Sequence, residues 1–326
     1  MKAIVYAKYG SPDVLELKEV ERPVPNDDEV LVKVHASSVN AADWHLLTAD
    51  IFLVRLNAGL LKPKRAILGS DVAGRVEAAG RNVKQFQPGD AVFGNVFAQR
   101  SGCFAEYVTA PESALALKPA NLSFEQAAAV PLAAITALQG LRDRGHVHPG
   151  LKVLINGASG GVGTFAVQIA KYFGAEVTAV CSTRNMETAR THGADHVIDY
   201  TKEDFTQNGQ RYELIAAVNG YHPISAYRRA LTPRGTYVMV GGTTAQIFQA
   251  LLLGSAMSRR QGQQLGALTL KPNPKDLPLL KELLETAKVV PVIDQSYPLS
   301  KVPDALRDFG TGHTRGKIVI TVASEP

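Results

Sequence analysis

The sequence predicts an α/β protein in which a doubly wound parallel sheet is inserted into a β-rich, barrel-like domain. The chain has 326 residues, which is long for one hydrophobic core and suits two domains. Residues 1 to about 122 contain short alternating apolar and polar runs between Gly and Pro, whereas strands and helices alternate in the middle of the chain. We therefore expect a β-rich domain made of 1–122 and 272–326, an α/β domain at 123–271, and a cleft between them.

The first region is predicted to form mostly antiparallel strands. Alternating runs occur at 29–39 (EVLVKVHASSV), 71–80 (DVAGRVEAAG) and 90–96 (DAVFGNV), and QPGD at 87–90 predicts a turn. The last part of the chain holds a helix at 275–287 and ends in the strand-like run RGKIVITV. This part resembles the first region more than the middle one, so we assign it to the β-rich domain.

The middle region begins with a helix signal. Ser123 and Gln126 have the spacing of a capping box. The alternation of strands and helices that follows predicts βαβ units and a parallel sheet covered on both faces. The expected strands lie at 152–156, 176–181, 196–200, 213–219 and 236–241, and the intervening helices begin near 161, 185 and 224.

Composition excludes several classes of protein. The net charge is +5 with scattered basic residues, so a nucleic-acid partner is not expected. The two cysteines, Cys103 and Cys181, form no CxxC pair, which leaves no disulfide framework and no cysteine-based zinc lobe. The longest apolar run contains Pro131 and is too short to span a bilayer, and the N-terminus lacks the apolar core of a signal peptide. We expect a cytoplasmic protein without a membrane span.

A glycine-rich turn follows the first strand of the middle region. The residues Ala158-Ser159-Gly160-Gly161-Val162-Gly163 match the G-x-G-x-x-G pattern with alanine in the first place. The strand before this turn and the helix after it predict a Rossmann domain, in which the helix N-terminus binds the pyrophosphate of a dinucleotide. The predicted cofactor-binding residues of this turn are Ser159, Gly160, Gly161 and Val162.

The end of the second strand predicts which dinucleotide is preferred. An NAD-binding domain places Asp or Glu there, but this chain has Ser182, Thr183 and Arg184, and no carboxylate is expected nearby. Two hydroxyls and a guanidinium suit a 2′-phosphate, so we expect NADPH rather than NADH. Tyr200, after the third strand, is a further candidate for this phosphate. The alternatives are a solvated Arg184 and a Tyr200 that only packs.

The chain resembles the medium-chain dehydrogenase/reductase superfamily, and within it the zinc-independent quinone oxidoreductase and alkenal (enone) reductase branch. Seven segments spread over nearly the whole length carry the resemblance: SSVNAADW, LGSDVAGRVEAAG, QPGDAVFG, AAAVPLAAITALQ, GASGGVGTFAVQIAK, GADHVIDY and RGKIVI. The resemblance implies a GroES-like fold for the β-rich domain.

The resemblance also locates the positions that bind catalytic zinc in the alcohol dehydrogenases of the superfamily. Here they are Asn40, Ser70 and Leu132, and the hydroxyl residue of the proton relay is replaced by Ala42. Amide, hydroxyl and isobutyl groups do not provide the thiolate or imidazole ligands of such a site. We expect no functional metal.

Without a metal, hydride addition to an activated double bond is favoured over alcohol oxidation. The carbonyl of a quinone or an α,β-unsaturated carbonyl compound already withdraws charge, and the oxyanion that forms needs only hydrogen-bond donors. We expect an NADPH-dependent reductase of such small molecules. The alternatives are a metal-free alcohol dehydrogenase or carbonyl reductase, and a non-catalytic NADPH-binding sensor or structural protein.

The resemblance implies further site residues. Asn40 and Asp43 are the catalytic candidates. Asn40 would donate to the ribose or the substrate oxygen, with a structural turn as the alternative. Asp43 would mainly fix the backbone of the same loop, with a direct catalytic role as the alternative. Trp44 could form a wall for a flat substrate or pack in the core, and His45 could donate a proton near the pocket or be structural. The remaining cofactor-binding candidates are Thr136, Asn219, Gly241, Gly242 and Lys317. The resemblance further implies that this part of the chain carries an edge strand that pairs two subunits; the short apolar run LGALTL at 265–270 would then be covered in a homodimer.

Overall fold

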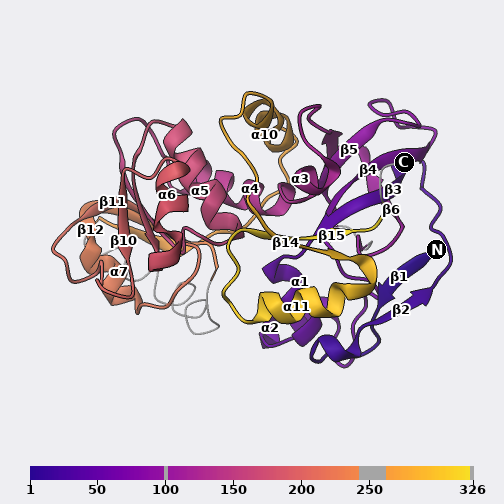
Figure 1. Ribbon diagram of the computed structural model, residues 1–326, viewed down its shortest axis with the longest axis horizontal. Coiled ribbons are helices and arrows are strands. Elements are labelled where there is room, and N and C mark those ends of the chain that lie inside the picture. The colour runs from indigo at the N-terminus through magenta and orange to yellow at the C-terminus, as the bar shows by residue number, and fades with distance from the viewer. Residues whose placement is uncertain (99–101, 242–261, 324–326) are drawn as a thin grey trace. The chain divides into compact units, whose positions relative to one another are not determined.

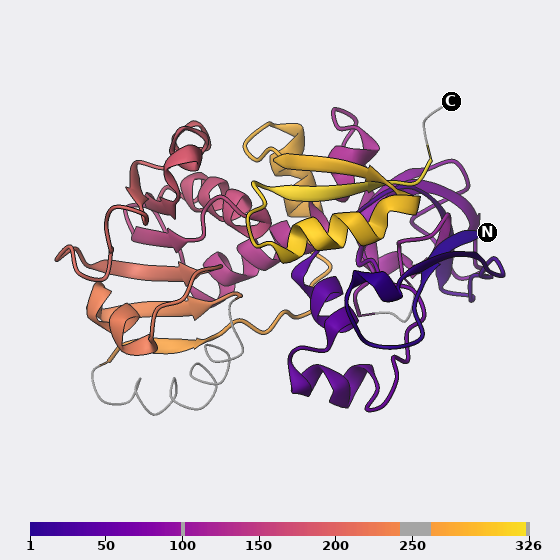
Figure 2. The ribbon, with the colours of Figure 1, turned by 60° about the horizontal axis from the view of Figure 1, so that its bottom comes forward.

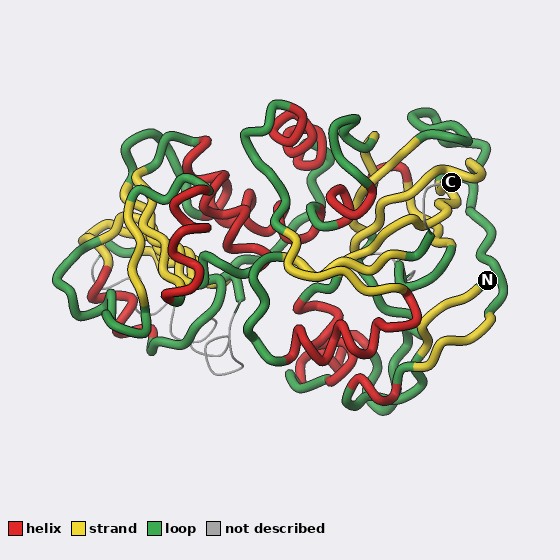
Figure 3. Tube along the Cα trace, viewed as in Figure 1, coloured by secondary structure: helices red, strands yellow, loops and turns green. Residues whose placement is uncertain are grey.

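The computed structural model describes residues 1–98, 102–241 and 262–323, and it divides the chain into two compact units. Unit 1 contains Met1–Ala133, Pro274–Ala287 and Pro291–Pro326, and unit 2 contains Ala134–Asn273 and Lys288–Val290. Each unit has its own main sheet, and the strands are yellow in Figure 3.

Unit 1 is the β-rich unit. Its main sheet has seven strands, ordered β14-β15-β3-β4-β5-β7, and β6 pairs with β3. All pairs are antiparallel except β14 with β15. The hairpin β1(Lys2–Val5)–β2(Glu16–Glu19) stands apart. The sheet strands are β3(Glu29–Ser38), β4(Asp71–Ala79), β5(Ala91–Asn95), β6(Tyr107–Pro111), β7(Leu115–Leu117), β14(Ile293–Pro298) and β15(Lys317–Thr321).

Helices of unit 1 come from both ends of the chain. In Figures 1 and 2, α11 lies beside β14 and β15, which it contacts. It buries Val302, Ala305 and Leu306 in a core cluster with Ile4 and Leu47. The helices are α1(Ala41–Thr48), α2(Phe52–Ala58), α3(Phe124–Ala128), α10(Asp276–Glu285) and α11(Val302–Gly310), with 3₁₀ turns η1(Pro12–Val14), η2(Glu112–Ala114) and η5(Leu299–Lys301).

Unit 2 has a six-stranded parallel sheet in the order β10-β9-β8-β11-β12-β13. The expected alternation of strands and helices is confirmed, and β13 forms one edge of the sheet. The strands are β8(Lys152–Asn156), β9(Glu176–Cys181), β10(His196–Asp199), β11(Tyr212–Ala217), β12(Leu231–Met239) and β13(Gln264–Ala267). The helices are α5(Gly161–Tyr172), α6(Met186–Thr191) and α7(Ile224–Ala230), with the π-helix η3(Gln139–Arg144) and the 3₁₀ turn η4(Thr183–Asn185). An α/β fold with a Rossmann-type parallel sheet and a separate β-rich unit is therefore confirmed.

The boundary between the units lies later than the predicted residue 122. The Ser123–Gln126 capping box starts α3, as expected. This helix packs on β3 and β4 and buries Phe124, so it belongs to unit 1. The chain passes from unit 1 to unit 2 within α4(Pro131–Leu138). The short segment Lys288–Val290 returns to unit 2 because the side chain of Gln168 hydrogen-bonds both the N–H and the carbonyl of Val290.

Candidate functional site

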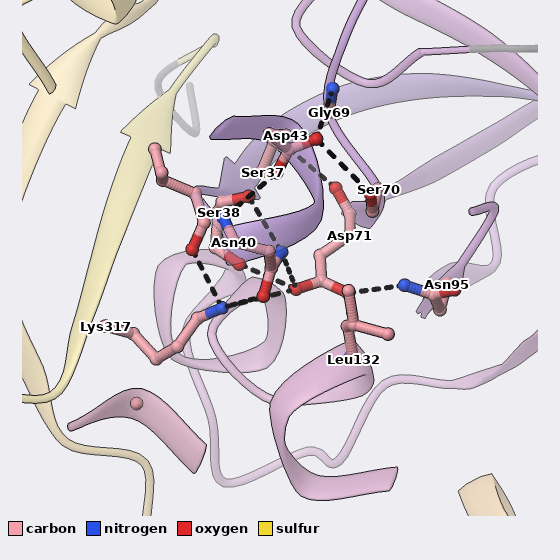
Figure 4. Close-up of polar contacts among 12 residues, drawn as sticks. Ser37, Ser38, Asn40, Asp43, Gly69, Ser70, Asp71, Asn95, Leu132 and Lys317 are labelled. Atoms are coloured by element: carbon pink, nitrogen blue, oxygen red, sulfur yellow. Dashed lines mark hydrogen bonds and ion pairs between the residues drawn. The ribbon is translucent and has the colours of Figure 1, made fainter. Parts of the chain in front are cut away.

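Unit 1 buries two carboxylates and one ammonium group in a single polar network, shown in Figure 4. Asp43 is 1% exposed, Asp71 0% and Lys317 3%. Asp43 lies in the first turn of α1, while Asp71 and Lys317 are the first residues of β4 and β15. Both strands pair with β3 around Ser38, which brings the three charged groups together.

Asp71 is the centre of this network. Its Oδ2 accepts hydrogen bonds from Ser38 Oγ (2.7 Å) and Asn40 Nδ2 (2.9 Å) and lies 3.6 Å from Lys317 Nζ. Its Oδ1 accepts from Asn95 Nδ2 (3.0 Å) and from the backbone N–H of Leu132 (2.8 Å). A buried carboxylate needs such partners to remain charged, so these groups hold Asp71 in one orientation.

Lys317 lies in the interior of unit 1. Its Nζ donates to the Val39 carbonyl (3.0 Å) and to Asn40 Oδ1. Burial lowers the pKa of Lys317, and the charges of Asp71 and Asp43 oppose this change. The ammonium group therefore contacts protein oxygens, and its predicted contact with the cofactor stays a prediction.

Asn40 connects the charged groups. Its Nδ2 donates to Asp71 Oδ2 and, at 3.3 Å, to the Ser38 carbonyl, while its Oδ1 accepts from Lys317. The residue is only 7% exposed. Both amide hydrogens are thus used within unit 1, and a hydrogen bond to a substrate oxygen would replace one of these bonds. The geometry fixes Asn40 in place, and its catalytic role stays a prediction.

Asp43 holds two pieces of backbone together. Its Oδ2 accepts from the Asn40 N–H (2.9 Å), and its Oδ1 accepts from the Gly69 N–H (3.0 Å) and Ser70 Oγ (3.3 Å). Burial raises the pKa of Asp43 to about 6, against the lowering effect of the two N–H donors. These contacts are those of the backbone anchor expected from the sequence.

The three positions that correspond to zinc ligands all belong to this network. Asn40 and Ser70 contribute side chains, whereas Leu132 contributes only its backbone N–H. No group of three or more His, Cys, Asp or Glu side chains suited to a metal occurs within 1–98, 102–241 and 262–323. That the protein needs no metal remains a prediction.

Trp44 and His45 have structural partners. Gly310 packs so closely on the indole that a Cβ there would lie 2.4 Å from Trp44 Cη2. The indole also faces Phe309 and joins the core cluster around Leu47. His45 Nδ1 lies 2.8 Å from Asp50 Oδ1. These contacts favour the structural alternative for both residues, and substrate contact by either one stays a prediction.

The glycine-rich turn of unit 2 joins β8 to α5 as expected. A Cβ at Gly163 would lie 2.1 Å from the Gly157 carbonyl oxygen, so helix packing requires glycine there. Gly160 is different, because its φ is −79° and a Cβ would have only one neighbour, the Gly157 oxygen at 3.8 Å. Packing within the turn gives no reason for glycine at 160, whereas close approach of a ligand does. Gly160 also leaves the first N–H groups of α5 without a side-chain cap, as phosphate binding requires.

Two other predicted cofactor residues, Asn219 and Gly241, lie at the same edge of the sheet. Parallel strands end together, and hydrogen bonds connect the chain after one strand to its neighbour. The N–H of Asn219 donates to the Asn156 carbonyl (3.2 Å), and the N–H of Gly241 donates to the Ala217 carbonyl (3.3 Å). Ser159, Gly161 and Val162 lie in or directly after the glycine-rich turn. Thr136 is a buried residue of α4, and Gly242 lies outside the described residues.

The expectation of no carboxylate beside the second strand is wrong. Asp199, the last residue of β10, is paired with Cys181, the last residue of β9, and its Oδ2 accepts from Thr183 Oγ1. Hydrogen bonds from Thr183 and Thr201 lower the pKa of Asp199 to about 2. The residues that directly follow β9 in the chain include no acid, but strand pairing places the end of β10 next to them.

This acid changes the surroundings of the predicted 2′-phosphate site. Thr183 donates to Asp199, so its hydroxyl hydrogen is already used. Lys202 Nζ lies 3.7 Å from Asp199 Oδ2 and offsets part of its charge. Ser182 and Arg184 follow β9, and Tyr200 is 60% exposed after β10. These six side chains form a mixed-charge rim, whereas only hydroxyl and basic groups are predicted there from the sequence.

Two protein families match this chain, and together they cover parts of both units. Residues 26–120 match the alcohol dehydrogenase GroES-like domain, and residues 192–320 match a family described as zinc-binding dehydrogenase. The chain is 32% identical to the chloroplast envelope quinone oxidoreductase homolog of Arabidopsis thaliana over 98% of each chain. It is 33% identical to the chloroplastic NADPH-dependent alkenal/one oxidoreductase of the same plant, over 98% of this chain and 79% of the relative.

A solved structure gives the same result. The quinone oxidoreductase from Coxiella burnetii matches with a TM-score of 0.88 and 31% identity, over 99% of both chains. Full-length similarity above 30% identity, two matching domains and the shared fold agree on one family. The chain belongs to the medium-chain dehydrogenase/reductase superfamily, as an oxidoreductase related to its quinone oxidoreductases and alkenal/one reductases.

Proposed function

We propose that the chain is an NADPH-dependent, metal-independent reductase of quinones or of the activated C=C bond of α,β-unsaturated carbonyl compounds. The observation that carries this proposal is the chemistry of the three residues at the positions that bind catalytic zinc in the alcohol dehydrogenases of the superfamily. An amide, a hydroxyl and a backbone N–H stand there, and all three bind the internal carboxylates Asp43 or Asp71. Those donors suit the fixing of a loop and not the coordination of a transition metal.

The glycine-rich turn supports a dinucleotide. The space above Gly160 and the uncapped N-terminus of α5 fit a pyrophosphate, and Gly163 keeps the helix tight against the turn. When bound, the nicotinamide supplies the hydride. Ser182, Arg184 and Tyr200 would surround a 2′-phosphate, while Asp199 would partly oppose it.

The network in unit 1 supports the reductive reaction. An oxyanion forming at the substrate carbonyl needs fixed hydrogen-bond donors in a site with little water. Asn40 is held in place by Asp71, Ser38 and Lys317, and a hydrogen bond to the substrate oxygen would replace its 3.3 Å bond to the Ser38 carbonyl. Asp43 holds the backbone of the Asn40 turn against Gly69.

The test is a turnover assay with NADPH and a panel of small quinones, enones and enals, followed by the loss of nicotinamide absorbance. We expect turnover with at least one of these compounds, and activity that survives a chelator. Oxidation of simple alcohols with NADP and no reduction of the panel would instead indicate a metal-free alcohol dehydrogenase. Tight NADPH binding without any turnover would indicate a sensor.

A further inference from the structure

Unit 2 carries a pocket at the edge of its sheet opposite the glycine-rich turn. The pocket has a volume of about 450 Å³, which is within the usual range for small-molecule sites. It lies at the amino ends of β11, β12 and β13, whereas the glycine-rich turn follows the carboxyl end of the parallel strand β8. Its lining residues are Arg211, Arg228, Arg229, Leu231, Pro233 and Gln263.

The pocket concentrates positive charge. Arg211 comes directly before β11, and Arg228 and Arg229 lie in the last turn of α7, which packs on β12 (Figure 1). Two of these guanidiniums donate to backbone carbonyls: Arg211 Nη1 to that of Gln210 (3.2 Å), and Arg229 Nη1 to that of Ser225 (3.4 Å). Within the described part of the chain, none of the three pairs with an Asp or a Glu side chain.

A buried amide oxygen points to the same ligand. Gln263 is 6% exposed, and its Nε2 donates to the carbonyls of Arg228 (3.2 Å) and Thr232 (3.0 Å). These two bonds fix the amide, and its Oε1 has no hydrogen-bond partner among the described residues. A buried acceptor without a donor is costly, so an O–H or N–H group from a ligand would stabilise it.

The helix dipole explains only part of this arrangement. Cations in the last turn of α7 interact favourably with its carboxyl end, which accounts for Arg228 and Arg229. The dipole does not account for Arg211, which lies outside α7, or for the Oε1 of Gln263, unpaired within 1–98, 102–241 and 262–323. Three arginines that line one pocket without acidic partners among the described residues are suited to an anion of several charges, because the planar fork of arginine binds phosphate oxygens in pairs.

We propose that this pocket binds a diphosphate group, free or carried by a nucleotide, at a site separate from the dinucleotide turn. The three arginines neutralise the phosphates, and Gln263 Oε1 accepts a hydrogen bond from a hydroxyl or amino group of the ligand or from a protonated phosphate oxygen. The apolar side chains of Leu231 and Pro233 would lie against the organic part of a nucleotide.

The test is calorimetric titration of the full-length protein, first saturated with NADPH so that the glycine-rich turn is occupied. One sample receives inorganic pyrophosphate and another receives ADP. We expect one further binding event in the wild type, weakened about tenfold in Arg229→Gln and more in the double variant Arg211→Gln/Arg229→Gln. Both residues are exposed, so these variants should fold, and an unchanged melting temperature checks this.

Arg234→Gln is the matched control, because Arg234 is an exposed arginine of β12 that does not line the pocket. It should bind both probes as the wild type does. Tighter binding of ADP than of pyrophosphate would assign the site to a nucleotide, and equal binding would assign it to free diphosphate. Absence of a second event at millimolar probe, or an equal loss in Arg234→Gln, would overturn the proposal. Turnover with NADPH is measured separately, so a failed pocket does not bear on the reductase function.

Discussion

The buried network of unit 1 and the glycine-rich turn of unit 2 differ in where their polar groups find hydrogen-bond partners. Around Asp71, the charged and polar groups find their partners inside the protein, and five donors surround one carboxylate. At Gly160, space and backbone N–H groups are left for something from outside. The first arrangement positions protein groups, and the second binds a ligand. Substitutions should therefore affect stability and chemistry in the network, but cofactor affinity at the turn.

The largest effect is expected for Lys317→Met. It leaves the Asp71 carboxylate buried without its ammonium partner, and breaking such a pair costs about 3–5 kcal/mol of unfolding free energy. Urea unfolding measures the loss. The control is Lys301→Met, whose side chain is 61% exposed beside Asp304, and it should change stability by less than ~0.5 kcal/mol. Similar small losses in both variants would mean that the network does not stabilise unit 1.

Asn40→Ala should lower turnover by a factor of about 10² to 10³ while NADPH affinity changes less, if the amide orients the reacting groups. Asn95→Ala is the matched control, because Asn95 donates to the other oxygen of the same Asp71 carboxylate. We expect both variants to lose stability but only Asn40→Ala to lose kcat. An equal fall in kcat in both would reduce Asn40 to a structural residue.

Asp43→Asn should remove a pH dependence from the stability of the network. The folded-state pKa is raised to about 6 from 3.8, so Asp43 contributes stability below pH 4 that is lost as the pH rises through 6. Relative to the variant, the wild type should lose up to about 3 kcal/mol between pH 4 and pH 6, and little more above that. Urea unfolding over this range measures the difference.

The exposed Asp13 gives a control of opposite sign. Arg307 holds its pKa below the usual value, so its contribution is lost only as the pH falls below 4. Asp13→Asn should therefore leave the slope between pH 4 and pH 6 unchanged. A flat difference between the wild type and Asp43→Asn over this range would contradict the assignment of Asp43.

Arg184→Ala tests the mixed-charge rim at the ends of β9 and β10. It should weaken NADPH binding by about 10- to 150-fold and leave NADH binding nearly unchanged, because only NADPH carries the 2′-phosphate. Asp199→Asn should act in the opposite direction and strengthen NADPH binding, since it removes a negative charge beside Thr183. Titration of both cofactors measures these effects, and equal losses for NADPH and NADH in Arg184→Ala would show that Arg184 does not bind the phosphate.

The smallest stability change is expected at Gly160. Gly163→Ala places a methyl group against the Gly157 oxygen and should destabilise unit 2 by about 1–3 kcal/mol. Gly160→Ala meets no close neighbour, so stability should change by less than ~0.5 kcal/mol while NADPH affinity falls. Thermal unfolding with and without NADPH separates the two effects, and wild-type NADPH affinity in Gly160→Ala would remove the argument for a ligand at this glycine.

The sequence alone determined the features that depend on neighbours in the chain. The Ser123–Gln126 cap, the strand–turn–helix around Gly160 and the alternation of strands and helices are local patterns with fixed spacing. The absence of zinc ligands at Asn40, Ser70 and Leu132 could likewise be predicted, because it depends only on residue identity at positions that the family resemblance supplies.

Tertiary structure decided which distant residues meet. Asp199 lies beside Thr183 because β10 pairs with β9. Lys317 reaches Asn40, 277 positions earlier in the chain, because β15 pairs with β3. The boundary between the units lies after α3, and not at the predicted residue 122, because this helix packs on β3 and β4. Periodicity indicates that a strand exists and which of its faces is apolar, but strand order and register arise from packing over the whole unit. For that reason the glycine-rich turn could be predicted from its own residues, while the partners of Asp71 and Thr183 could not.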